Sequence, residues 1–235
     1  MKNYLHTEKI HSGSNLKDII LGGQVGLVNV LWVILAVAVA TYDTKIVIIA
    51  GLAATFAESI SMAAVAYTST KAALSYCISR IKKEEQEIEK DPKLIEKEIY
   101  DIYYGKGFRG TLLNKIVNGI ISNKDILLKT LMSEQHGLRE EDFGNPLKST
   151  FIVGFSAFLG SLIPLLPFLF LNVKEGIILS LILSALALFI TGAVKAKLTI
   201  GSWLKSGLEI LAIGMAAALI GYIIGTLFGN VNFLN

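Results

Sequence analysis

The sequence predicts an all-α integral membrane protein with five transmembrane helices and a helical insert between the second and the third. Of its 235 residues, 53% are hydrophobic and only 17% are charged, a composition typical of membrane proteins. Five apolar stretches lie near 19–41, 46–79, 149–171, 176–194 and 203–228. Each is long enough to cross a hydrocarbon core, which takes ~20 helical residues. Residues 80–148 instead hold 13 of the 22 Lys and Arg and 13 of the 19 Asp and Glu. We therefore expect three parts: 1–79 with a lead and two spans, the insert at 80–148, and 149–235 with three spans.

The first part begins with a polar lead over residues 1–17. Ser14 or Asn15 has the side chain of a helix cap and is expected to start the first span. The second apolar stretch runs into charged residues with no Gly or Pro between 70 and 90. The spacing therefore predicts one helix that leaves the membrane and continues into water.

The insert is expected to consist of short helices. Asp91 followed by Pro92 is typical of a cap and a first helical residue, and that helix should end near Gly105. Two further helices are predicted over 111–122 and 124–136, the second capped by Asn123 and ended by Gly137. Pro164 and Pro167 are expected to kink the third span.

The loop charges predict the orientation of the chain. Lys195 and Lys197 share one short loop, and five spans place that loop on the same side as the basic lead and the insert. The positive-inside rule puts the N-terminus and the insert in the cytoplasm. The host membrane is either the cell membrane or a vacuolar membrane.

Glu58 lies about midway along the second span. A carboxylate at that depth costs on the order of 3 kcal/mol or more, and such residues mark ion or proton pathways. Met62 follows one turn later on the same face, so an oxygen and a sulfur ligand would line one path. The alternative is a protonated Glu58 that hydrogen-bonds to a neighbouring helix.

The insert offers a second set of metal ligands. Glu84 and Glu87 are spaced i, i+3 and share a helix face. If Glu98 and the turn with Met132 and Glu134 fold against that face, carboxylates and a thioether converge. Carboxylates alone suit Mg, Ca and Mn, whereas added sulfur suits Fe(II). The alternative is a solvated face in which Glu and Lys pair.

Other function classes are disfavoured. The chain has no nucleotide-binding loop, no Ser/His/Asp set and no context for a Cys nucleophile, so we predict no enzyme activity and no organic cofactor. A net charge of +3 gives no argument for nucleic acid. The single cysteine, Cys77, excludes a Cys-rich zinc site.

Four stretches together resemble the vacuolar iron transporter family, in the wider sense of ferrous iron and manganese transporters. They are residues 6–38, 51–72, 84–108 with 131–138, and 151–170. The resemblance implies five transmembrane helices, a cytoplasmic helical metal-binding domain, and a homodimer with a pathway between the protomers' first two helices. It also implies proton-coupled export of Fe2+ or a similar divalent ion, so that metal ions, protons and lipid are the partners.

By position, the resemblance places soluble metal ligands at Glu84, Glu87, Glu98 and Met132. Two further ligand positions fall on Ile95, beside Glu96, and on Gln135, beside Glu134. In the membrane the family methionine falls on Met62.

The membrane positions also show departures. An Asp expected in the first span is Val25, and a Glu expected in the second span is Ala54, one turn from Glu58. Trp32 stands where a small residue is expected and would fill space in a pathway. Two hypotheses follow: a divalent-metal/proton antiporter that uses Glu58, or a non-transporting relative that binds metal as a sensor or structural protein.

Overall fold

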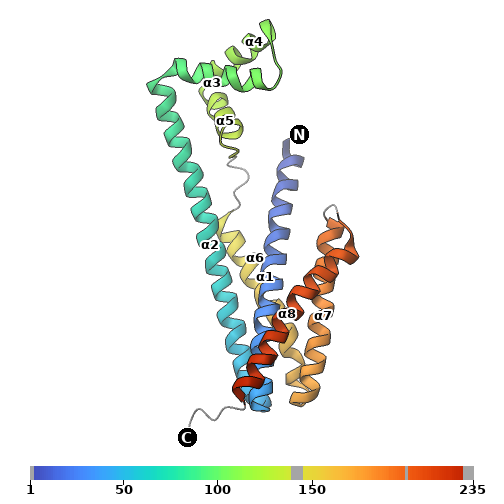
Figure 1. The fold of residues 1–235 in the computed structure, drawn as a ribbon. Helices are drawn as coiled ribbons and strands as arrows, with labels where there is room; N and C mark the ends of the chain where they lie inside the picture. The colour runs from blue at the N-terminus through green and yellow to red at the C-terminus, as the bar shows by residue number, and fades with distance from the viewer. Residues whose placement is uncertain (1–2, 139–144, 199–200, 230–235) are drawn as a thin grey trace. The chain divides into compact units, whose positions relative to one another are not determined.

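The computed structural model describes residues 3–138, 145–198 and 201–229, with side chains from residue 15 onward. The predicted segments that include residues 1–2, 139–144, 199–200 and 230–235 lie partly outside the described residues. The described part is helical and contains no strand (Figure 1). Its elements are α1 (Asn3–Thr41), α2 (Thr44–Lys90), α3 (Pro92–Gly105), α4 (Gly110–Ile121), α5 (Lys124–Glu134), α6 (Pro146–Leu165), the 3-10 helix η2 (Leu166–Leu169), α7 (Val173–Leu198) and α8 (Trp203–Gly229).

The chain divides into two compact units. Residues 1–67 and 146–235 form the first, which we call the membrane unit, and residues 68–145 form the second, the insert unit. Five helical segments of the described chain are long and apolar enough to cross a membrane, as the sequence predicts: Asn15–Thr41, Thr44–Lys90, Pro146–Leu169, Val173–Leu198 and Trp203–Gly229.

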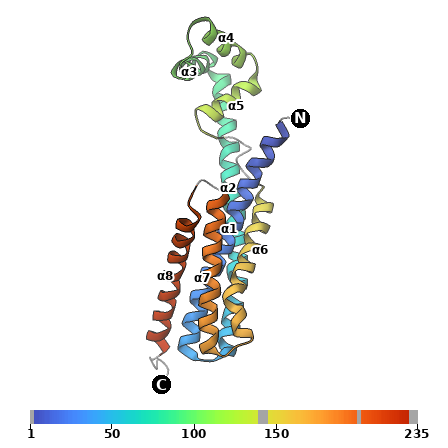
Figure 2. The same cartoon turned by 90° about the vertical axis from the view of Figure 1, so that its right-hand side faces the viewer.

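The first helix, α1, is the central element of the membrane unit. It packs against α6, α7 and α8 (Figure 2), and Val30, Leu31, Ile34 and Leu35 are almost completely buried. Gly26 of α1 lies so close to α6 that an added Cβ would stand 2.3 Å from the carbonyl oxygen of Ala157. Small residues therefore allow the backbones to touch, which is a common way for membrane helices to pack.

The expected helix cap at Ser14 or Asn15 is wrong, because α1 runs without interruption from Asn3. The polar lead contains no proline, and its one glycine, Gly13, costs a helix only about 1 kcal/mol. Nothing in the lead therefore stops the helix before the apolar span.

The prolines of the third span act where the sequence predicts. Pro164 lies inside α6, and one residue further on, after Leu165, the α-helix gives way to the 3-10 turn η2. The Ser180 hydroxyl of α7 donates to the Pro164 carbonyl oxygen at 2.8 Å. A side chain from a neighbouring helix thus satisfies a carbonyl at the end of α6, where the α-helical pattern stops.

The insert unit contains the last part of α2 together with α3, α4 and α5. The Asp91 side chain accepts from the Leu94 amide at 3.1 Å, and Asn123 caps α5 in the same way. Both caps stand at their predicted positions. The unit has its own apolar core, made of Ile95, Ile99, Leu113, Val117, Ile120, Leu127 and Leu131.

Candidate metal sites

Within the described part of the membrane unit, Glu58 has one direct polar partner. The Asn29 side-chain amide of α1 donates to Glu58 Oε1 of α2 at 2.9 Å. Both side chains are half-buried. An amide carries no net charge, so this bond orients the carboxylate without neutralising it.

A small cavity lies beside this pair. It has a volume of about 200 Å³, and its lining consists of Asn29, Val30, Trp32, Val33, Ala54 and Glu58. Asn29 and Glu58 are thus the two polar side chains of an otherwise apolar lining. The volume is enough for an ion with a few water molecules, since one water occupies roughly 30 Å³ of liquid.

The register of α1 and α2 explains how the predicted positions relate to this cavity. The helices run antiparallel around the turn at Tyr42 and Asp43 (Figure 1). Asn29 faces Glu58, which fixes how the two helices are aligned. One turn before Asn29, Val25 lies at the level of Met62 of α2. One turn after Asn29, Val33 lies at the level of Ala54. Val33 and Ala54 indeed line the same cavity. The two positions where a carboxylate is expected, Val25 and Ala54, therefore lie one turn on either side of the Asn29–Glu58 pair.

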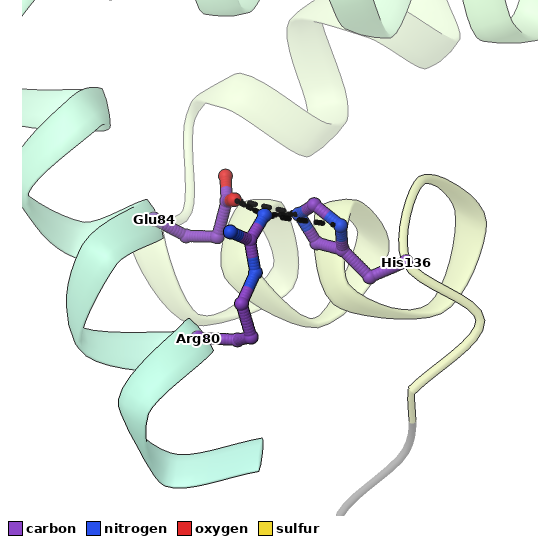
Figure 3. Close-up of polar contacts among 3 residues, drawn as sticks. All are labelled: Arg80, Glu84 and His136. Carbon is purple, nitrogen blue, oxygen red and sulfur yellow. Dashed lines mark hydrogen bonds and ion pairs between the residues drawn. The ribbon is translucent and has the colours of Figure 1, made fainter. Parts of the chain in front are cut away.

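Among the described residues of the insert unit, Glu84 is the most buried carboxylate, with 2% of its side chain exposed. Its Oε1 accepts from Nε2 of His136 at 2.6 Å and from Nη2 of Arg80 at 3.3 Å (Figure 3). Nη2 of Arg80 also lies 3.2 Å from Nδ1 of the His136 ring. Because a carboxylate only accepts, the short contact between Nε2 and Glu84 is a hydrogen bond that the ring donates from Nε2.

Glu98 of α3 lies near the same group. Burial raises the pKa of its carboxyl, and the negative charges of Glu84 and Glu87 raise it further. The nearby His136 and a hydrogen bond from Gln135 act in the opposite direction and are weaker. Three of the predicted ligands are therefore close enough for their charges to interact.

The other predicted ligands of the insert have different surroundings. Glu87 and Glu96 are exposed, and Met132 is 5% exposed. The Glu134 carboxylate forms an ion pair with Lys106 at 2.5 Å. Met62 of the membrane unit is half-buried. Within the described residues, no group of three or more His, Cys, Asp and Glu side chains is arranged to hold a metal ion.

Sequence reasoning did not identify Asn29, Arg80 or His136 as members of these groups. Two local signals pointed to the first two residues. Asn29 lies one helical turn after the expected ligand position Val25, just as Glu58 lies one turn after Ala54. Arg80 is spaced i, i+4 from Glu84. His136 is 52 residues from Glu84, and no local pattern connects the two.

Comparison with known proteins decides the family. The model of the VIT family matches residues 16–226. The chain belongs to the VIT family. It is 29% identical to vacuolar iron transporter 1 of Arabidopsis thaliana over 215 residues, which is 91% of this chain and 86% of that protein. It is 30% identical to the vacuolar iron transporter of Plasmodium falciparum over 226 residues, 92% of this chain and 83% of that protein. These relatives are named as transporters and not as enzymes, in agreement with the sequence prediction.

Proposed function

We propose that this VIT family member is a transporter that exports Fe2+, or a similar divalent ion such as Mn2+, from the cytoplasm in exchange for protons. The names of its relatives support iron as the cargo. The observation that carries the proposal is the Glu58 carboxylate, which lines a cavity between two membrane helices and has a neutral partner. A carboxylate in this setting binds either a cation or a proton, and this alternation is what exchange requires.

In this proposal Glu58 replaces both expected carboxylates. Along the helix axis, Glu58 lies between the positions of Val25 and Ala54. A single carboxylate would therefore bind the ion where the family resemblance leads us to expect two. Asn29 supplies a neutral oxygen and Met62 a sulfur one turn from Glu58. An intermediate metal such as Fe2+ accepts such a mixed set more readily than Mg2+ or Ca2+ does.

The insert unit is proposed to lie in the cytoplasm, with the N-terminus, and to collect metal for the membrane unit. The buried Glu84 and the nearby Glu87 and Glu98 support this role. Two protomers are proposed to form a homodimer, as the family resemblance implies.

The second hypothesis is a non-transporting relative that only binds metal. Val25 and Ala54 supply no ligand, and the Trp32 side chain occupies part of the cavity wall. In this case the cavity would be closed to ions, and the scaffold would serve as a sensor or a structural partner.

Transport into liposomes distinguishes the two hypotheses. Purified protein is reconstituted around a metal-quenched dye, and Fe2+ and Mn2+ entry is followed with and without a pH gradient. We expect gradient-dependent entry in the parent and in Glu175→Gln, which alters an exposed acid at the start of α7. Entry in Val25→Asp but not in the parent would support the non-transporting hypothesis.

A further inference from the structure

The Arg80–Glu84–His136 group has an unusual feature for a structural ion pair. One guanidinium nitrogen, Nη2 of Arg80, touches both potential ligand atoms: it lies 3.3 Å from Glu84 Oε1 and 3.0 Å from His136 Nε2 (Figure 3). These two atoms are themselves 2.6 Å apart. A positive group therefore lies against an oxygen and a nitrogen that both ligate transition metals.

We propose that Glu84 and His136 form a two-residue chelate for a divalent transition metal, and that Arg80 is a resident cation that must leave before the metal binds. The inference rests on the proposed role of the insert unit in metal collection. To that role it adds His136 as a nitrogen ligand, Arg80 as a cation that competes with the metal, and a preference among metals. An imidazole ligand favours Fe2+, Co2+, Ni2+ and Zn2+ over Mn2+, Mg2+ and Ca2+.

The geometry requires only a small rearrangement. Metal–donor distances of about 2.0–2.2 Å place two ligand atoms roughly 3 Å apart when they subtend a right angle. Oε1 and Nε2 therefore need to separate by only a few tenths of an ångström. Metal binding requires the ring proton to lie on Nδ1, so that Nε2 presents its lone pair to the metal.

Arg80 is able to leave without a backbone movement. Its side chain is 28% exposed, whereas that of Glu84 is 2% exposed. A long side chain at a partly open position rotates into water at a small cost. Glu84 is too buried to remain without a counter-charge, so departure of Arg80 is coupled to arrival of the metal.

The nearby carboxylates fit this exchange. Glu87 and Glu98 act electrostatically on the same site. A divalent ion that replaces one guanidinium raises the positive charge at this point by one unit, and these acids compensate for the increase.

The test is metal binding by the full-length protein in a Glu58→Gln background, which removes the proposed membrane ligand. Apo protein is titrated with Co2+ and with Mn2+ by calorimetry, and the visible absorption of bound Co2+ reports nitrogen ligation. Arg80→Gln should bind Co2+ about tenfold more tightly, because the competing charge is gone. Arg109→Gln is the matched control: this arginine lies over the Tyr104 ring in the same unit and is no part of the group.

His136→Ala should weaken Co2+ binding at least tenfold, change the absorption and remove the preference over Mn2+. Unchanged or weaker Co2+ binding by a folded Arg80→Gln would overturn the resident-cation role. An unchanged absorption in His136→Ala would overturn the chelate. Binding that behaves as expected, together with a parent protein that moves no metal into liposomes, would contradict the proposed transport and leave this inference intact.

Discussion

The two units each contain a carboxylate away from bulk water, and the two carboxylates have different partners. Glu58 of the membrane unit is held by the neutral Asn29 amide, whereas Glu84 of the insert unit is held by Arg80 and His136. A neutral partner orients a carboxylate and leaves its charge for a cation or a proton. A charged partner supplies the counter-charge in advance, so an incoming metal must compete. Under the two proposals above, the difference separates a carboxylate that is free to exchange cations from one that already has a counter-charge.

The strongest way to break this comparison is to give Glu58 a charged partner. Asn29→Lys would place an ammonium beside the carboxylate, as Arg80 stands beside Glu84. We expect transport to fall about a hundredfold or more, because the lysine occupies the ion's place in a low-dielectric site. The rate of dye quenching in liposomes measures it, and Asn29→Ala, which removes only one hydrogen bond, should keep part of the activity. A fully active Asn29→Lys would show that Glu58 is not the ion ligand.

The opposite change removes the charged partner of Glu84. Arg80→Gln should lower the free energy of unfolding of the metal-free protein by about 2 kcal/mol, because a buried carboxylate loses one of its two partners. Thermal unfolding of the full-length protein measures the loss, and saturating Co2+ should restore most of it. If metal-free Arg80→Gln is as stable as the parent, Glu84 does not depend on that charge.

Glu98 provides a pH-dependent test of the insert unit. Its pKa is raised in the folded protein by burial and by Glu84 and Glu87. The contribution of such a group to stability is complete below its unfolded pKa and is lost as the pH rises through the folded pKa. Glu98→Gln should therefore raise the unfolding midpoint of the metal-free protein near pH 7, and the gain should disappear on acidification towards pH 4. A gain that is equal at both pH values would contradict the charge argument.

The smallest effect is expected at Lys124, which forms an exposed ion pair with Glu89 at 2.7 Å. Each partner shifts the pKa of the other, downward for Glu89 and upward for Lys124. Both groups are open to solvent, where water screens their attraction. Lys124→Ala should leave the unfolding midpoint unchanged within error, and a clear drop would mean that surface charge contributes more to this unit than its burial suggests.

Much of the fold was predictable because its signals are local. Hydropathy and length gave the five spans, the unbroken run after Lys71 gave the long α2, and Asp91–Pro92 gave the start of α3. The wrong cap at Ser14 or Asn15 shows the limit of this reasoning. A residue that is able to cap a helix can also lie inside a longer helix.

The sites were predictable only in part, because they depend on side chains that are distant in sequence. The sequence singles out Glu58 and Glu84 as candidate ligands from their own positions, and both stay predictions. It does not single out their partners: Asn29 is 29 residues from Glu58, and His136 is 52 residues from Glu84. The alignment of α1 against α2 brings Asn29 to Glu58. The turn after α5 brings His136 to Glu84.

The proposed transport requires the Glu58 carboxylate to alternate between metal and proton. The most direct test is simultaneous measurement of Fe2+ entry and proton exit in liposomes that contain the parent protein or Glu58→Gln. The account predicts linked fluxes of metal and protons in the parent and neither flux in Glu58→Gln. Linked fluxes that persist in Glu58→Gln would contradict it.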